Sequence, residues 1–220
     1  MERIIEPTLL QHEFSSLFPR LILASSSPNR RKLIQDGGSI VEVFTPEADE
    51  SIEGLGLVEA MEKNARVKME AYLSSPLFSP LLPAISADTL VHIDNKLLGK
   101  PKDRNDAKNT LHLLSGRRQT VLTGCALYLP EIGMKVFCDQ ADVIFKKLSD
   151  EEIESYLDLE EWKGAAGGYR LQKNGWKLVE KIEGDWTTVV GLPLERLIEL
   201  KKSFNQEARR NAPDPAEESL

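Results

Sequence analysis

Small hydroxyl residues connect a short apolar run to the start of a helix in the segment Ala24-Ser-Ser-Ser-Pro-Asn-Arg-Arg31. Ser27 suits the N-cap and Pro28 the first helical position. The free backbone N–H groups of such a helix start bind anions, whereas the helix dipole disfavours cations there. A bound phosphate would reverse this penalty for Arg30 and Arg31. The segment therefore predicts a phosphate site about as strongly as it predicts a capped helix with two solvated arginines.

One acidic residue, Asp88, lies inside the apolar segment Ile85-Ser-Ala-Asp-Thr-Leu-Val91. Burying a carboxylate in such a strand is costly unless the group is paired or binds a metal. Asp88 is therefore the strongest single candidate for a functional residue. The competing interpretation is an aspartate at a strand end that accepts a hydrogen bond from a nearby backbone amide.

A second carboxylate and two lysines could complete a site for a metal and phosphates. Glu50 follows Asp49 after a predicted strand, and Mg²⁺ prefers oxygen ligands while keeping several of its waters. Lys68 and Lys100 could neutralise phosphate charge. Taken alone, the acidic pair is more typical of a solvated turn, and each lysine is more typical of a solvent-facing side chain.

The elements that must position these residues follow from apolar periodicity and from capping and turn residues. Strands are predicted at 21–24, 40–44, 85–93, 120–129 and 135–145, the last two as a hairpin, and helices at 28–36, 57–72, 103–114, 150–157 and 194–204. Residues 169–182 are predicted as strand and turn. This order favours an α/β fold with a mixed twisted sheet and helices on both faces. We expect an unassigned extension at 1–20, one domain at 21–204 and a disordered tail at 205–220.

Composition narrows the class of protein. The 220 residues carry a formal net charge of −7, which argues against non-specific nucleic-acid binding but leaves room for a local cationic pocket. No apolar run is long enough to span a membrane, and the first residues do not resemble a secretory signal, so we expect a cytoplasmic protein. Cys125 and Cys138 are equidistant from the predicted hairpin turn and could face each other, although packing is the favoured role. The three histidines lack metal-ligand spacing.

Four stretches, in order, make the chain resemble the Maf family. They are residues 23–30; Ala87-Asp88-Thr89 with Leu98-Gly99-Lys100-Pro101; residues 114–116 with Thr123-Gly124; and residues 166–172 with 182–185 and 190–194. Each stretch is weak alone, and the ordered set is specific. The resemblance spans about residues 21–200. It implies an elongated two-lobed Maf/ITPase-like fold with a central cleft, homodimerisation, and a nucleoside triphosphate pyrophosphatase that uses Mg²⁺ or Mn²⁺.

The resemblance also implies roles for individual residues. By position, Asp88 is similar to the catalytic base and, with Glu50, to the metal-binding acids. Ser27, Arg30, Lys68 and Lys100 match phosphate contacts. Asn29, Thr89 and Gln172 match positions that set base specificity, and the last two resemble the branch acting on dTTP and UTP.

Three departures from the family pattern keep other functions open. Asn29 replaces a frequent arginine or tryptophan, Gln119 a frequent histidine, and Gly164-Ala165 a frequent Asp-Lys pair, for which Lys163 could substitute. A regulator that binds nucleotides with little catalysis is one alternative, and a 7-methyl-GTP pyrophosphatase is another.

Overall fold

A computed structural model describes residues 8–94, 96–130 and 132–211 and contains one mixed β-sheet. The strand order is β2-β1-β3-β5-β6-β7, with β4 paired to the far end of β3. The parallel strands are β1 (Arg20–Ala24), β2 (Ile40–Phe44) and β3 (Ala84–Ile93), and the antiparallel ones are β4 (Lys96–Leu97), β5 (Arg118–Leu129), β6 (Gly133–Phe145) and β7 (Val179–Glu183). The predicted mixed sheet and hairpin are confirmed.

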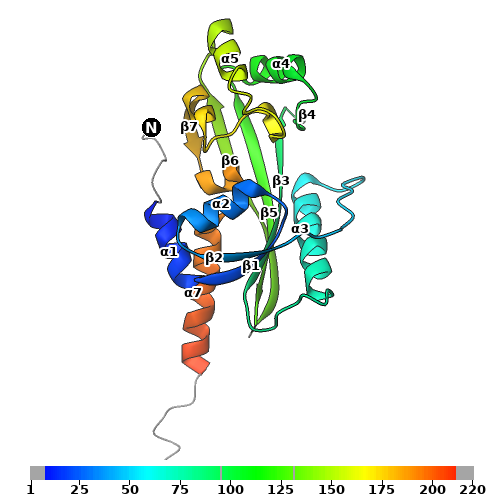
Figure 1. The fold of residues 1–220 in the computed structure, drawn as a ribbon, viewed down its shortest axis with the longest axis vertical. Coiled ribbons are helices and arrows are strands. Elements are labelled where there is room, and N and C mark those ends of the chain that lie inside the picture. Colours follow the sequence, from blue (N-terminus) through cyan, green and yellow to red (C-terminus); the bar gives the residue numbers. More distant parts are fainter. Residues whose placement is uncertain (1–7, 95, 131, 212–220) are drawn as a thin grey trace, which may run out of the picture.

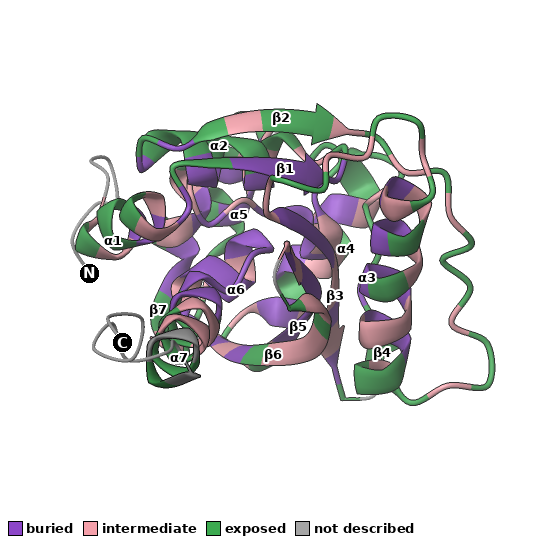
Figure 2. Cartoon of the chain, turned by 90° about the horizontal axis from the view of Figure 1, so that it is seen from below, coloured by how far each residue is buried: buried purple, intermediate pink, exposed green. Residues whose placement is uncertain are grey.

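Helices cover both faces of this sheet, as predicted, and the molecule is elongated (Figure 1). On one face lies α3 (Leu57–Leu73), which packs Ala65 and Met69 against Ile22 of β1. The other face carries α2 (Pro28–Asp36), α6 (Trp186–Val190) and α7 (Leu194–Asn211), and α4 (Arg104–Leu114) and α5 (Asp150–Leu157) sit together at one end of the molecule. Figure 2 shows β1 and β3 buried between these layers and β2 exposed at the edge.

The N-terminal segment contains a helix that the sequence interpretation left unassigned. This helix, α1 (Leu9–Leu17), begins at a capping box in which Thr8 and Gln11 bond each other's backbone N–H groups. Phe14 and Phe18 are fully buried and their rings stack with centroids 4.7 Å apart. The Thr-x-x-Gln spacing was the available signal, and apolar contacts with α7 make α1 part of the fold.

Two other expectations need correction, and one helix was not predicted. The last helix continues to Asn211, so residues 205–211 of the expected tail are helical, and residues 212–220 of that expected tail lie outside the described residues. The segment 169–182 forms a 3₁₀ turn, Asn174–Leu178, before β7, and α6 follows an N-cap at Asp185 that was missed. Cys125 pairs in register with Phe137 and Cys138 with Gly124, so the two thiols lie on opposite faces of the sheet. In the described part of the chain, no helix is both long and apolar enough to cross a membrane.

Candidate active site

The candidate site begins where β1 ends beside β3. The two strands pair only as far as Ala24 and Ser86, after which the chain turns through Ser25–Ser27 into α2 while β3 continues. The carboxyl ends of parallel strands commonly bind ligands because the chain diverges there and leaves a crevice. Alternation along β3 then sends Asp88 to the α3 face and Thr89 to the α2 face, so the strand serves both sides of this edge.

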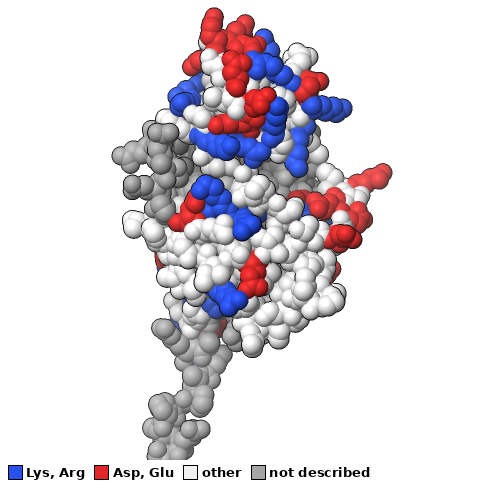
Figure 3. Space-filling view, in the orientation of Figure 1, with Lys and Arg blue, Asp and Glu red and all other residues white. Residues whose placement is uncertain are grey.

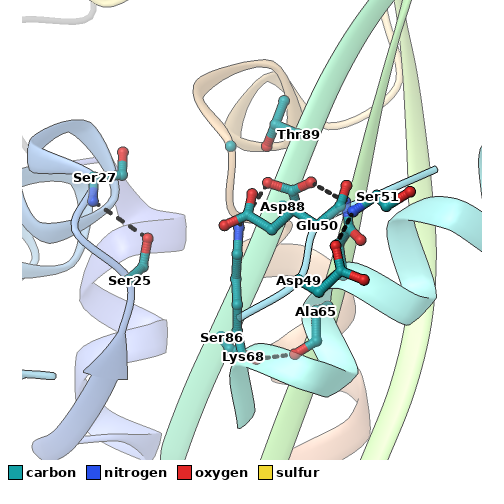
Figure 4. Close-up of polar contacts among 12 residues, drawn as sticks. Ser25, Ser27, Asp49, Glu50, Ser51, Ala65, Lys68, Ser86, Asp88 and Thr89 are labelled. Atoms are coloured by element: carbon teal, nitrogen blue, oxygen red, sulfur yellow. Dashed lines mark hydrogen bonds and ion pairs between the residues drawn. The ribbon is translucent and has the colours of Figure 1, made fainter. Parts of the chain in front are cut away.

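Lys68 of α3 joins the two acidic residues singled out by the sequence (Figure 4). Its Nζ lies 2.8 Å from Asp88 Oδ1 and 3.0 Å from Glu50 Oε2. The lysine side chain is only 8% exposed, whereas that of Asp88 is 18% exposed and that of Glu50 is 48% exposed. A buried ammonium therefore balances two carboxylates whose oxygens still reach solvent. The interpretations of Asp88 as backbone-bonded and of Lys68 as solvent-facing are wrong.

Asn64 is a site residue that sequence reasoning missed. Its Nδ2 donates to Asp88 Oδ2 at 2.9 Å and to the backbone oxygen of Glu50 at 3.2 Å, so it orients both acidic residues. Its Oδ1 is buried and lacks a partner among the described residues. Asn64 and Lys68 are four residues apart on one helix, a spacing that places both side chains on the same face. That spacing was the signal available in the sequence.

Gly124 explains how α3 comes so close to Asp88. It lies opposite Asp88 on β5, and a Cβ at this position would come within 2.0 Å of the backbone oxygen of Met61. Only a residue without a side chain permits this approach. The glycine therefore sets the distance at which Asn64 and Lys68 meet the strand.

The start of α2 forms the opposite side of the site. Ser27 caps the helix by accepting a hydrogen bond from the backbone of Arg30, and its own N–H donates to Ser25 Oγ. Figure 4 shows this turn facing the Asp88 group from another element. The predicted N-cap is confirmed, and the backbone N–H groups of this first turn remain suited to an anion.

Arg30 is buried, so the interpretation of this segment as a capped helix with two solvated arginines is wrong for Arg30. Its guanidinium donates from Nε to the Gly191 oxygen at 2.6 Å, from Nη1 to Ser25 Oγ at 2.8 Å and from Nη2 to Thr89 Oγ1 at 2.8 Å. Burial lowers the pKa of Arg30, and the negative charges of Asp88 and Glu50 oppose that shift. Arg31, in contrast, is exposed. Arg30 of the helix start thus bonds Thr89, the residue that follows Asp88 on β3.

A pocket adjoins this group and brings together the three predicted specificity residues. Asn29 of α2, Thr89 of β3 and Gln172 all line it. Its other walls are mostly apolar and include Val91, Val121, Ala165, Ala166, Tyr169, Leu171, Val189 and Val190. Apolar walls with a few polar groups are typical of small-molecule sites. Arg170 also lines the pocket, and sequence reasoning had not singled it out.

The remaining sequence candidates lie elsewhere. Lys100 is exposed in the loop after β4, and within the described ranges it makes no ion pair with Asp88 or Glu50. The same loop is tied to the pocket wall because Gly167 donates to the Gly99 oxygen at 3.1 Å. Gln119 is buried and donates to Tyr169 Oη at 2.5 Å. Lys163 binds Glu160 instead of replacing a pocket lysine.

The charge distribution suits a phosphorylated ligand despite the net charge of −7. Figure 3 shows Lys and Arg side chains gathered across the middle of one face, between the end that carries α4 and α5 and the sheet below. A local cationic region of this kind attracts anions that the whole molecule repels at long range.

The donor set fits a divalent cation that shares its ligands with a substrate. Among the described residues there is no cluster of three or more His, Cys, Asp or Glu side chains placed to hold a metal. Mg²⁺ commonly takes one or two carboxylates and completes its shell with waters and phosphate oxygens. Asp88 and Glu50 are two carboxylates within 3.0 Å of one cation, Lys68 Nζ, so they meet that smaller requirement.

Acidic, basic and amide groups that converge beside an apolar pocket suit a nucleotide hydrolase, and this is the class of α/β enzyme that the fold and site define. The sequence model of the family described as "Maf-like protein" matches residues 20–204. The chain therefore belongs to the Maf family, as the motifs predicted.

Curated relatives agree with this assignment. The protein of Caldanaerobacter subterraneus subsp. tengcongensis is 37% identical, with 83% of this chain and 88% of the relative aligned. The proteins of Thermoanaerobacter pseudethanolicus and Carboxydothermus hydrogenoformans are each 39% identical, with 84% and 81% of this chain and 97% and 95% of the relatives aligned. All three relatives are named dTTP/UTP pyrophosphatase.

Proposed function

We propose that this protein hydrolyses dTTP and UTP to the monophosphate and pyrophosphate. The observation that carries the proposal is the Lys68 bridge between Asp88 and Glu50, 2.8 and 3.0 Å long, next to a pocket lined by Thr89 and Gln172. Acidic groups that could hold a metal and direct a water thus adjoin a cavity whose apolar walls and few polar groups suit a nucleobase. The names of the curated relatives support the same substrates.

In this mechanism Asp88 orients or deprotonates a water that attacks the α-phosphorus, and pyrophosphate leaves with the electron pair of the broken P–O bond. Asn64 holds the carboxylate of Asp88 in place through its 2.9 Å hydrogen bond. Lys68 and the α2 N-terminus at Ser27 offset the charge of the phosphates. A divalent cation held by Asp88 and Glu50 would supply further stabilisation of charge on the phosphate oxygens.

Arg30 contributes in two ways. Three of its five N–H groups bond Gly191, Ser25 and Thr89, which fixes the guanidinium inside the protein. One N–H on each terminal nitrogen remains for a phosphate oxygen, because a guanidinium carries five donors. A fixed cation of this kind keeps the leaving group in line with the attacking water.

The test is a substrate panel with matched variants. The protein is incubated with Mn²⁺ and dTTP, UTP, CTP or 7-methyl-GTP, and pyrophosphate release is measured. We expect turnover of dTTP and UTP and a loss of about 100-fold or more in Asp88→Asn, the scale of a positioned acid or base. Asp36→Asn, on the exposed end of α2, is the control. Near-normal turnover by Asp88→Asn would reject the mechanism, and a preference for 7-methyl-GTP would reject the substrate assignment.

The family resemblance also leads us to propose a homodimer. Light scattering of the purified protein should give twice the mass of one chain, 24.7 kDa. A concentration-independent monomer mass would reject this part of the proposal and leave the catalytic part untouched.

A further inference from the structure

Arg170 is a charged side chain on the pocket wall whose role the proposed mechanism leaves open. It lies two residues before Gln172, and both line the pocket together with Asn29 and Thr89. Its guanidinium is held on one edge by the chain itself, because Nε donates to the Glu161 oxygen at 3.0 Å and Nη2 to the Lys163 oxygen at 2.7 Å. The plane of the guanidinium is therefore fixed by backbone groups.

A third hydrogen bond crosses the pocket. Arg170 Nη1 donates to Asn29 Oδ1 at 3.3 Å, and these two residues are 141 positions apart in the chain. Asn29 belongs to the first turn of α2, the turn that starts the proposed phosphate site. The contact joins the two walls of the pocket and aims one guanidinium nitrogen across it.

Counting donors shows what Arg170 has left to offer. Five N–H groups belong to a guanidinium, and three of them donate to Glu161, Lys163 and Asn29. One N–H remains on each terminal nitrogen, and in the described parts of the chain neither has a further acceptor. Arginine has donors only, so a ligand group that meets Arg170 must present an acceptor.

We propose that Arg170 is a specificity residue that donates a hydrogen bond to the 4-carbonyl oxygen of uracil or thymine, with Asn29 positioning it. This inference rests on the proposed function and adds a residue that contributes to the recognition of the nucleobase. The apolar walls formed by Val91, Val121 and Leu171 suit a flat ring better than a triphosphate, which is why the acceptor is placed on the base.

The chemistry of the bases turns this contact into selectivity. Uracil and thymine present carbonyl oxygens on both sides of N3–H, whereas cytosine presents an amino group in place of one of them. Arginine can only donate hydrogen bonds, so it pairs with the carbonyl oxygen. Opposite the amino group of cytosine, which also donates, its N–H would have no acceptor. Leaving a buried donor without a partner is costly, so Arg170 selects for UTP and dTTP over CTP.

The test compares the selectivity of three single-substitution variants with that of the unmodified protein. The ratio of kcat/KM for UTP to kcat/KM for CTP is measured with Mn²⁺ for Arg170→Ala, Asn29→Ala and the control Arg117→Ala. Arg117 likewise donates to a backbone oxygen, that of Leu113, but it lies outside the pocket lining. We expect Arg170→Ala to lower the ratio about 10- to 100-fold, the range for losing one hydrogen bond to a charged group, and Arg117→Ala to leave it unchanged.

Asn29→Ala keeps the inference testable if Arg170→Ala disturbs the segment that holds Glu161, Lys163 and Arg170. It leaves the two backbone contacts of Arg170 in place and removes only the partner that aims Nη1. We expect it to lower the ratio about 3- to 10-fold, as for a positioned rather than a lost donor. Trp162 is buried next to Glu161 and Lys163 and contributes to the near-UV circular dichroism of the protein, so an unchanged spectrum indicates that this segment stays folded.

The outcomes separate this inference from the proposed function. If the unmodified protein releases no pyrophosphate from any nucleotide, the proposed function fails and takes the inference with it. If it hydrolyses UTP but both variants keep the original ratio, the inference alone is overturned. An equal loss for UTP and CTP would also overturn it, because that result assigns Arg170 to phosphate binding or to loop structure.

Discussion

Lys68 is the residue on which the charge balance of the site depends, because it contacts both carboxylates and is nearly buried. Replacing it with methionine keeps most of the packing and leaves Asp88 and Glu50 facing each other without their cation. We expect Lys68→Met to lower kcat/KM for UTP about 10- to 100-fold, the range for losing a hydrogen bond between charged groups. Steady-state kinetics at fixed Mn²⁺ measure the effect.

A matched control exists five residues earlier on the same helix. Lys63 contacts the Ser51 oxygen at 2.7 Å and Asp49 at 3.9 Å but does not bond Asp88. Lys63→Met should therefore keep kcat/KM within about twofold. Equal losses in both variants would mean that general charge on α3, rather than the bridge, is what matters.

The two cysteines give a second prediction at this scale. Burial raises the pKa of Cys138 to about 12, with added repulsion from Glu62 and Asp139, and burial also raises the pKa of Cys125. Only the thiolate reacts with iodoacetamide, so at pH 8 both thiols should be alkylated slowly in the native protein and rapidly in urea. Mass spectrometry over time measures this, and fast native labelling of Cys138 would contradict the burial argument.

Sequence reasoning found individual residues of the site better than their contacts. An aspartate in an apolar strand is conspicuous because its burial needs a reason, and this made Asp88 identifiable from residue type alone. The partners of Asp88 come from 20 and 24 positions earlier on another element. Their convergence depends on how α3 packs, which periodicity does not reveal. Arg170 was missed because an arginine in a loop carries no local signal of what it contacts.

At the scale of elements, the packing of α3 on β5 decides whether the site can form. Gly124→Ala would place a methyl group 2.0 Å from the Met61 oxygen, a backbone atom that cannot turn aside. Overpacking of this kind costs about 1–3 kcal/mol or more. We expect a lower free energy of unfolding in urea and also a lower kcat, because α3 must move and carry Asn64 and Lys68 away from Asp88.

Gly99→Ala is the matched control for stability, since the added methyl group would meet open space. It should shift the urea midpoint little. If Gly124→Ala folded with unchanged stability and activity, then the close approach of α3 would not be what positions the lysine.

Elements with strong local signals were predicted well, whereas those defined by tertiary contacts were not. The strand at 40–44, the capped helix after Ser27 and the hairpin were all confirmed. In contrast, α6 has five residues, too few for a periodic pattern. Asp185 starts it through a buried carboxylate that accepts local bonds from Thr187 and a third bond from the backbone N–H of Glu195, and this third contact exists only once α7 has packed beside it.

At the scale of the whole molecule, α1 ties the N-terminal part of the described chain to its last helix. Phe14 is fully buried, Glu13 forms an ion pair with Lys202 of α7, and Gln11 donates to the Leu33 oxygen of α2 at 2.9 Å. These contacts join segments that lie far apart in the sequence, so they form only when the whole chain is folded. We therefore expect α1 to contribute to global stability rather than to local order.

Phe14→Ala should lower the free energy of unfolding by about 3–5 kcal/mol, the usual cost of deleting a buried aromatic ring. Leu9→Ala on the same helix, where the side chain is 89% exposed, should cost little. Because α1 meets α2 at Leu33 and Gly37, at the end away from Ser27, kcat of Phe14→Ala at low temperature should stay within about twofold. Urea unfolding and kinetics on the same preparations measure both effects. A loss of kcat without a loss of stability would mean that α1 acts on the site through α2 rather than by supporting the fold.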